Sequence, residues 1–454
     1  MCEHYDLIVI GGGPGGHALA EDAAICGARV SVIEKSGWGG TCTHRGCVPT
    51  KALLACSRRW MEIKKMKRFG ISMSHETFDF KAMKRHQQQM IRVSALGVER
   101  SLQKAGVDVR MGEAVLTDPN MVCWRSPTGA SKILTAKNIC IAWGSQPATL
   151  PNVPLSARVL TSDEFLNLED LPRRVIIIGG SVIGIEFATI LAELGVQVTI
   201  IEICPCLLPL EDEEAAAVIQ KELTLLGVVV RTATSVTAVS EKPDRVRVSA
   251  KHEDGPAELE ADYVLVCTGR RPRLYSDQLG ALGIQYDEKG IWVDSHQETN
   301  LPGIYAIGDV TGGMMLAHRA MQQGKALASY LFSQEVVICR ENAIPSVVYS
   351  HPPIARVGPT QQQAAFLGLD TECVKLDFGA NIMARTELAG QGFVKLLFHR
   401  QKIIGACIVG AQADELIASL SLAVHKKMGK EAFQNWVKPH PTFSEIVNVR
   451  GPIT

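Results

Sequence analysis

Two cysteines close to the N-terminus have a spacing suited to redox chemistry. Cys42 and Cys47 have four residues between them. A regular helix would turn their side chains about 140° apart, so a disulfide needs a distorted turn, which Gly46 permits. At a helix start beside His44 and Arg45, free backbone donors and positive charge would stabilise either thiolate. Zinc ligation, for which no second pair stands at suitable spacing, and two buried thiols are the alternatives.

A candidate base lies near the other end of the chain. The run HPTFSE places His440 and Glu445 five positions apart. Thiol-disulfide exchange needs a base that takes a proton from an incoming dithiol, and a histidine oriented by a carboxylate can do so. A lone histidine would more often be structural.

The elements that must position the cysteines start with a β-α-β unit. An apolar run at 6–10 leads into Gly11, Gly13 and Gly16. A helical stretch of small residues and a second apolar run, ending at Glu34, follow. Such glycines allow a tight turn, a close approach of the backbone to a pyrophosphate and close packing of helix on strand. Glu34 can accept hydrogen bonds from ribose hydroxyls, unless it is only a solvated strand end.

A second unit repeats this pattern. An apolar run at 175–178 precedes Gly179 and Gly184, with Ser181 in the middle position, and the next strand ends at Glu202. Glu202 follows Gly179 by 23 residues, the same separation as in the first unit. Two dinucleotide-binding units are a more specific signal than one. The Glu202 carboxylate would repel a 2′-phosphate, which favours NAD over NADP, and the alternative is again a solvated strand end.

Small-residue turns follow three further apolar strands. They are ICIAWGSQP (139–147), YVLVCTGRRP (263–272) and GIYAIGDV, which ends at Val310. Gly269 in the second turn is a candidate nucleotide-binding residue, and Asp309 in the third suits a hydrogen bond with a sugar or ribityl hydroxyl. From residue 345 onward no glycine fingerprint occurs, which indicates a separate α/β module.

Length and composition limit the class of protein. A chain of 454 residues predicts roughly two to four domains. Its 47 Lys+Arg balance 47 Asp+Glu, so no global field attracts nucleic acid or an anionic membrane. No apolar stretch approaches the ~20 residues of a spanning helix, and the N-terminus leaves no room for a signal peptide. We therefore expect a cytoplasmic protein without a metal site, whose 13 cysteines are mostly reduced core thiols.

The cysteine segment resembles that of the flavin-dependent pyridine nucleotide-disulfide oxidoreductases, and the resemblance extends over essentially the whole chain. Their pattern GGTC-x-x-x-GC-x-P-x-K is met by Gly39, Gly40, Thr41, Cys42, Gly46, Cys47, Pro49 and Lys51. The family's H-P-T-x-x-E pattern is also intact at 440–445. These two motifs together are highly specific.

The resemblance implies a role for each matched residue. Cys42 would be the interchange thiol that attacks substrate, and Cys47 would lie against the flavin ring. Lys51 would pair with Glu186 near the flavin and nicotinamide. His440, oriented by its carboxylate, would be the base in the active site of a partner subunit.

The implied fold is α/β, with two Rossmann-like domains for FAD and NAD and a C-terminal α+β dimerisation domain. The expected boundaries are 1–148 for the FAD-binding domain, 149–275 for the NAD-binding domain, 276–342 for a central segment that completes the FAD site, and 343–454 for the interface domain. A homodimer is implied.

Within the family, residues 315–324 and 410–417 resemble the dihydrolipoamide dehydrogenases. The implied reaction is oxidation of a dihydrolipoyl group, bound to a carrier protein or domain, by NAD through FAD. Lys438 and Arg45 depart from the usual pattern and add positive charge where substrate would approach. The alternatives are an NAD(P)H-dependent reductase of another small disulfide and, from another class, a redox-inert NAD-sensing protein. The basic run at 58–68 is a solvated helix face or a contact for an acidic carrier domain.

Overall fold

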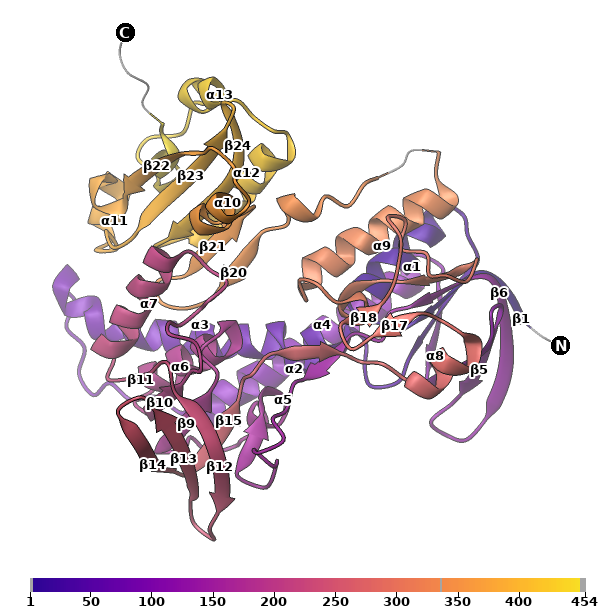
Figure 1. The fold of residues 1–454 in the computed structure, drawn as a ribbon, viewed down its shortest axis with the longest axis horizontal. Coiled ribbons are helices and arrows are strands. Elements are labelled where there is room, and N and C mark those ends of the chain that lie inside the picture. The colour runs from indigo at the N-terminus through magenta and orange to yellow at the C-terminus, as the bar shows by residue number, and fades with distance from the viewer. Residues whose placement is uncertain (1–2, 335–336, 450–454) are drawn as a thin grey trace.

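The chain folds into three sheet-based parts, shown in a computed structural model (Figure 1). The structure describes residues 3–334 and 337–449. The outer ends of the expected first and last domains, residues 1–2 and 450–454, lie outside the described residues.

The first part is a mainly parallel sheet built on the first glycine fingerprint. Its seven strands have the order β3-β2-β1-β6-β5-β4, with β19 beside β6. The elements up to the first closing turn are β1 (Glu3–Ile10), α1 (Pro14–Ile25), β2 (Val30–Glu34), α2 (Gly40–Arg45), α3 (Cys47–Lys65), η1 (Met66–Phe69), α4 (Phe80–Lys104), β3 (Asp108–Met111), β4 (Glu113–Asp118), β5 (Met121–Arg125), β6 (Ser131–Ile141) and β7 (Ser145–Pro147). The expected β-α-β unit is therefore present.

The chain returns to this sheet after its second part. The returning elements are α8 (Ser276–Leu282), β17 (Tyr286–Asp287), β18 (Gly290–Ile291), β19 (Ile304–Ala306), η2 (Gly308–Thr311) and α9 (Ala317–Phe332). Strand β19 pairs in parallel with β6, and α9 packs against α1 (Figure 1). This return carries the turn with Asp309 to the carboxyl ends of β1 and β6.

The second part is a five-stranded parallel sheet of order β11-β10-β9-β15-β8. Its elements are β8 (Val159–Thr161), α5 (Ser162–Phe165), β9 (Arg174–Ile178), α6 (Val182–Glu193), β10 (Gln197–Ile201), α7 (Glu213–Leu225), β11 (Val229–Arg231), β12 (Ser235–Glu241), β13 (Val246–His252), β14 (Gly255–Ala261), β15 (Tyr263–Val266) and β16 (Arg270–Pro272). The second fingerprint thus stands between β9 and α6. Strands β7 and β16 of the two closing turns pair with each other, which joins the two parts.

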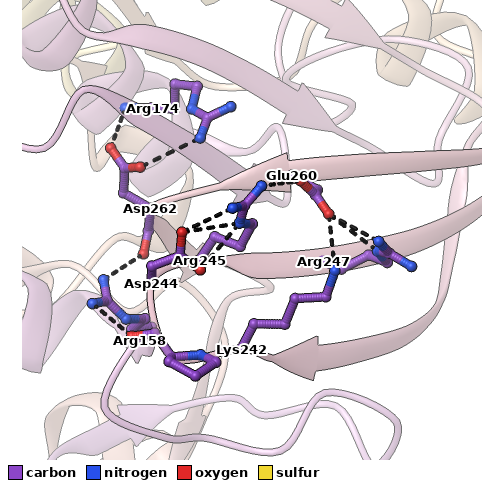
Figure 2. Close-up of polar contacts among 9 residues, drawn as sticks. Arg158, Arg174, Lys242, Asp244, Arg245, Arg247, Glu260 and Asp262 are labelled. Atoms are coloured by element: carbon purple, nitrogen blue, oxygen red, sulfur yellow. Dashed lines mark hydrogen bonds and ion pairs between the residues drawn. The ribbon is translucent and has the colours of Figure 1, made fainter.

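Strands β12, β13 and β14 form a separate antiparallel sheet whose hairpins carry an ion-pair network (Figure 2). Glu260 is paired with Arg245 at 3.1 Å, Arg247 at 3.0 Å and Lys242 at 3.3 Å. Asp262 accepts from the backbone N–H of Arg174 at 2.9 Å. The network ties this small sheet to the start of β9, and as a partly exposed surface cluster it has a structural role.

The third part is an antiparallel sheet of order β20-β21-β24-β23-β22. Its elements are η3 (Glu341–Ala343), β20 (Ser346–Val348), β21 (Ile354–Val357), α10 (Gln361–Phe366), β22 (Glu372–Asp377), η4 (Phe378–Ala380), α11 (Ile382–Thr386), β23 (Phe393–His399), β24 (Lys402–Val409), α12 (Ala413–His425), α13 (Lys430–Asn435) and η5 (Phe443–Val447). The separate α/β module expected from residue 345 is present, and β20 begins at Ser346.

One apolar cluster crosses all three parts. It joins Leu53 of α3 with the buried face of α6 and with Val348 and Ile354 of the third sheet. The expectation that most cysteines are core thiols is wrong for the described residues, where Cys140, Cys267 and Cys407 are the buried ones. In the described part of the chain, no helix is both long enough and apolar enough to cross a membrane.

Candidate functional site

The first glycine loop has the shape that a pyrophosphate needs. Gly11 has φ +120°, and an added Cβ would lie 2.2 Å from the carbonyl oxygen of Ala142. An added Cβ at Gly16 would lie 2.0 Å from the carbonyl oxygen of Gly11, so only glycine allows α1 to pack this closely on β1. Gly13 instead faces open space, with nothing within 4 Å of an added Cβ. The backbone at Gly13 is therefore accessible to a phosphate at the start of α1.

The second loop repeats this geometry. Gly179 has φ +112°, and a Cβ there would meet the carbonyl oxygen of Cys267 at 2.3 Å. A Cβ at Gly184 would lie 2.0 Å from the carbonyl oxygen of Gly179. Ser181 is the N-cap of α6 in extended conformation, and its side chain makes no capping hydrogen bond. The substitution in the middle position is accommodated without a change in the loop.

Glu34 and Glu202 hold equivalent positions in the two units. The backbone N–H of Gly12 donates to Glu34 Oε2 at 2.8 Å, and that of Gly180 donates to Glu202 Oε2 at 2.6 Å. Both side chains are buried, so the alternative of a solvated strand end is wrong for both. A carboxylate oxygen has two lone pairs, so each can still accept a ribose hydroxyl. Cys204 N–H also donates to Glu202, at 2.8 Å.

The cysteine segment has the distorted turn that the spacing required. Helix α2 ends at Arg45, Gly46 has φ −143° and ψ −107°, and α3 begins at Cys47. Both thiols are reduced in the structure. Because Cys47 is the first residue of the long helix α3, the free backbone N–H groups there favour a negative charge on its sulfur.

The two thiols differ in acidity. A hydrogen bond from the Cys42 thiol, followed by the charge of Lys51, lowers the pKa of Cys47 from 9.0 to about 7. The same hydrogen bond, together with burial, raises the pKa of Cys42. The first proton therefore leaves Cys47, and Cys42 needs a base before it can act as a thiolate.

The source of positive charge differs from the expected one. His44 Nε2 is 3.1 Å from the carbonyl oxygen of Trp38, and Arg45 Nε is 3.7 Å from Asp163. Neither residue is the cation that acts on Cys47. The expectation that these two residues stabilise a thiolate is wrong, because the carbonyl oxygen of Trp38 and the carboxylate of Asp163 hold their side chains instead.

Lys51 supplies that charge from the next turn of α3. Its Nζ lies 2.9 Å and 2.8 Å from the two carboxylate oxygens of Glu186, which confirms the expected pair. Sequence reasoning missed a third member, Tyr349, which follows β20. Its backbone N–H donates to Glu186 Oε1 at 3.2 Å, and Lys51 Nζ lies 4.3 Å from its ring centroid. The position of Tyr349 directly after the apolar run Val347–Val348 was the available signal.

A cleft of about 440 Å³ joins these groups. Its lining includes Gly11, Gly13, Gly16, Glu34, Cys42, Cys47, Lys51, Glu186 and Asp309 from the sequence-based candidates. Asp309 also accepts a hydrogen bond from Ser145 Oγ. The open loop at Gly13, the buried acceptor Glu34 and the cysteines in one cleft fit a dinucleotide whose redox end faces the thiols.

Four of the cofactor-binding candidates lie outside the lining of this cleft. They are Gly179, Gly184, Glu202 and Gly269. Gly269 has φ +106° and its carbonyl oxygen accepts from the N–H of Ala148 at 3.0 Å, so it contributes to the junction of the two closing turns. The first three belong to the second fingerprint, and they fit a second nucleotide.

His440 and Glu445 also lie outside that lining. His440 Nδ1 is 3.0 Å from Glu445 Oε1, and the histidine side chain is 73% exposed. The N–H of Thr442 and His440 together lower the pKa of Glu445. Lys438, expected beside a substrate channel, donates from Nζ to the carbonyl oxygen of Phe433 at 3.3 Å, and burial lowers its pKa.

Known proteins match this chain along nearly its whole length. Residues 5–324 match the family model described as pyridine nucleotide-disulphide oxidoreductase, and residues 344–450 match that of its dimerisation domain. The dihydrolipoyl dehydrogenase of Geobacillus stearothermophilus is 38% identical, over 97% of this chain and 94% of the relative. That of Chlamydia pneumoniae is 35% identical, over 98% of this chain and 96% of the relative.

Solved structures share the fold. LpdA from Mycobacterium tuberculosis superposes with a TM-score of 0.91 at 26% identity, over 98% of both chains. The HOCl-induced flavoprotein disulfide reductase RclA from Escherichia coli superposes with a TM-score of 0.86 at 27% identity, also over 98% of both chains. The expected fold class is confirmed.

Proposed function

The chain belongs to the pyridine nucleotide-disulphide oxidoreductase family, and from that membership we propose that it oxidises a protein-bound dihydrolipoyl group with NAD. As a family member it is a flavoprotein disulfide oxidoreductase that uses FAD and NAD. Full-length similarity to dihydrolipoyl dehydrogenases supports the substrate class. One observation carries the chemistry: of the two cysteines joined by the turn at Gly46, Cys47 has a lowered pKa and Cys42 a raised one.

Exchange starts from a disulfide between Cys42 and Cys47. A thiolate of the dihydrolipoyl group attacks Sγ of Cys42, the two sulfurs bond, and Cys47 leaves as a thiolate. The second substrate thiol loses its proton to a base and attacks the substrate sulfur of this mixed disulfide. The lipoyl disulfide closes, Cys42 is released and protonated, and two electrons have passed to the cysteine pair.

The unequal acidities support this assignment of roles. A thiol of lower pKa is the better leaving group, which suits Cys47 with its pKa of about 7. Cys42, whose pKa is raised, takes the proton back at the end of the exchange. The Lys51–Glu186 pair keeps the stabilising cation beside the leaving sulfur.

His440 is the base, and it acts in the site of a second subunit. Its imidazole is held by Glu445 but is mostly exposed to solvent within one chain. The match of residues 344–450 to a dimerisation domain supports a homodimer whose two-fold symmetry brings each His440 to the partner's cysteines. The carboxylate orients the ring and stabilises it when it carries the proton.

The cleft fits FAD and the second fingerprint fits NAD. Glu34 would accept from a ribose, the Gly13 backbone would face the pyrophosphate, and Asp309 would bind a ribityl hydroxyl. FAD bound there supplies two-electron transfer between the cysteine pair and a nicotinamide. Around the second loop, Glu202 would accept from the NAD ribose. The protein acts in the cytoplasm. Its partner is a lipoyl-bearing carrier protein or domain.

Steady-state kinetics test the proposal. The purified protein is assayed with dihydrolipoamide, and in reverse with lipoamide and glutathione disulfide, using NAD and NADP in the matching oxidation state. We expect catalytic efficiency to be highest with dihydrolipoamide and NAD, and to be lost in Cys42→Ser. A higher efficiency with another disulfide would support the alternative reductase, and no turnover with any of them would support the NAD-sensing alternative.

A further inference from the structure

Helix α6 carries a second buried carboxylate, Glu193, seven residues after Glu186. Seven residues are almost two helical turns, so both side chains lie on the same face of α6. The Glu193 side chain is 1% exposed, and both of its oxygens have partners. Ser57 Oγ donates to Oε2 at 2.6 Å, and His351 Nδ1 lies 2.8 Å from Oε1.

The two carboxylates join the same three segments. Glu186 binds Lys51 of α3 and the backbone N–H of Tyr349. Glu193 binds Ser57 of the same helix and His351 of the same extended segment. Each glutamate therefore links the cysteine-bearing helix to the chain that follows β20.

An apolar cluster packs the same three segments together. Leu53 of α3, Ile190 and Leu194 of α6 and Val348 of β20 all belong to the apolar cluster at this junction. Apolar side chains alone would hold three packed segments together, and a buried carboxylate is not needed for stability. Its two directed hydrogen bonds instead restrict how α3 and segment 349–351 can slide along α6.

We propose that Glu193 is a positioning residue: by holding Ser57 and His351 it keeps Lys51 in place between Cys47 and Glu186. This inference rests on the proposed function in one respect, because the proposed exchange is what gives the Cys47 thiolate its role. The geometry itself involves no substrate. Cys47 and Lys51 both lie on α3, so a shift of α3 along α6 separates Lys51 from Glu186. The Lys51 ammonium is then free to turn away from Cys47, which weakens an interaction that acts through space.

The direction in which the pKa of Cys47 moves when Glu193 is replaced distinguishes a positioning role from a direct charge effect. Removal of a nearby negative charge would by itself lower the pKa of a thiol. Displacement of Lys51 would raise it. The charged and titratable groups around Cys47 are Cys42, Lys51, Glu186 and Tyr349, and Glu193 is not among the principal ones.

The test measures the acidity of Cys47 directly. FAD-loaded protein is reduced with dithiothreitol without oxygen, and iodoacetamide alkylation is followed from pH 5 to 10. Trypsin separates the two thiols, because Arg45 and Lys51 end their respective peptides. In Glu193→Ala and His351→Leu we expect the alkylation midpoint of Cys47 to rise by about one pH unit, with a several-fold slower reaction at neutral pH. Glu193→Gln, which can keep both hydrogen bonds, should stay near the unmodified protein.

Asp212→Asn is the matched control. Asp212 forms a buried ion pair with Lys395 at 2.9 Å, which also joins the second part to the third but at another place. We expect this variant to lower the melting temperature without moving the Cys47 midpoint. An unchanged or lowered midpoint in folded Glu193→Ala and His351→Leu would overturn the proposal, and so would an equal rise in Asp212→Asn. Since alkylation needs no substrate, a failure of dihydrolipoamide turnover would refute the proposed function alone.

Discussion

The imidazole of His440 is held 3.0 Å from the carboxylate of Glu445 and still has 73% of its side chain exposed. The pair lies outside the lining of the cleft that contains Cys42 and Cys47. A base must come within hydrogen-bond reach of the proton that it removes. We therefore expect His440 to reach the cysteines of another copy of the chain.

Hybrid dimers test this arrangement. One chain carries Cys42→Ser and the other carries His440→Ala, and each variant is nearly inactive as its own homodimer. In the hybrid, one site receives both lesions and the other receives none. Activity should return to about half that of the unmodified dimer, because one of two symmetric sites is intact.

The hybrids are verified by native mass spectrometry before assay. A hybrid of Cys42→Ser with an unmodified chain serves as the control, and it should also have about half activity, since it too has one intact site. A double-variant hybrid that stays inactive would mean that His440 serves its own chain or has no part in catalysis.

Local patterns allowed much of the architecture to be predicted from the sequence. The two β-α-β units follow from apolar runs and glycines a few residues apart, and steric contacts such as Gly16 with Gly11 explain why those glycines are needed. The turn between Cys42 and Cys47 follows from helical geometry in the same way. In each case the cause lies within about thirty residues, where sequence spacing determines spatial position.

Contacts between distant segments could not be read in this way. Tyr349 and His351 meet α6 across more than 150 residues, and no local pattern marks Glu193 as different from a solvated helical glutamate. Arg45 was misjudged for the same reason. Its partner, Asp163, stands on α5, and only the folded chain brings that carboxylate close enough to compensate the charge.

Glu202 should set the choice of nucleotide. A 2′-phosphate about 5 Å from this buried carboxylate would be repelled by about 3 kcal/mol at an effective dielectric constant of 20. We expect Glu202→Gln to lower the ratio of kcat/KM for NAD to that for NADP by at least about tenfold. Glu34→Gln, assayed with saturating FAD, is the matched control in the first unit and should leave the ratio unchanged. Equal efficiency with both nucleotides in the unmodified enzyme would contradict this role.

After the hydrogen bond from Cys42, Lys51 should make the next contribution to the pH range in which Cys47 reacts. With its pKa lowered from 9.0 to about 7, Cys47 becomes a thiolate as the pH rises through neutrality and loses reactivity as the pH falls below it. In Lys51→Met the lowering charge is absent, so the alkylation midpoint of the reduced protein should move to higher pH. The reaction of Cys42, followed on its own tryptic peptide, should start only at alkaline pH in both proteins. A Lys51→Met midpoint that stays near neutrality would show that the hydrogen bond from Cys42 stabilises the thiolate without help from Lys51.

Two alanine substitutions in the first glycine loop should have opposite consequences. A Cβ at Gly13 meets nothing within 4 Å, so Gly13→Ala should fold with an unchanged melting temperature in the absence of FAD. The methyl group would occupy the space where a pyrophosphate approaches the backbone, and FAD affinity should fall by at least about tenfold.

A Cβ at Gly16 would lie 2.0 Å from the carbonyl oxygen of Gly11, so Gly16→Ala must push α1 away from β1. We expect it to destabilise the apoprotein by about 1–3 kcal/mol, as overpacking does in other cores. Thermal unfolding and fluorescence titration with FAD measure the two effects separately. A Gly13→Ala protein that binds FAD as tightly as the unmodified chain would contradict the placement of the pyrophosphate at this loop.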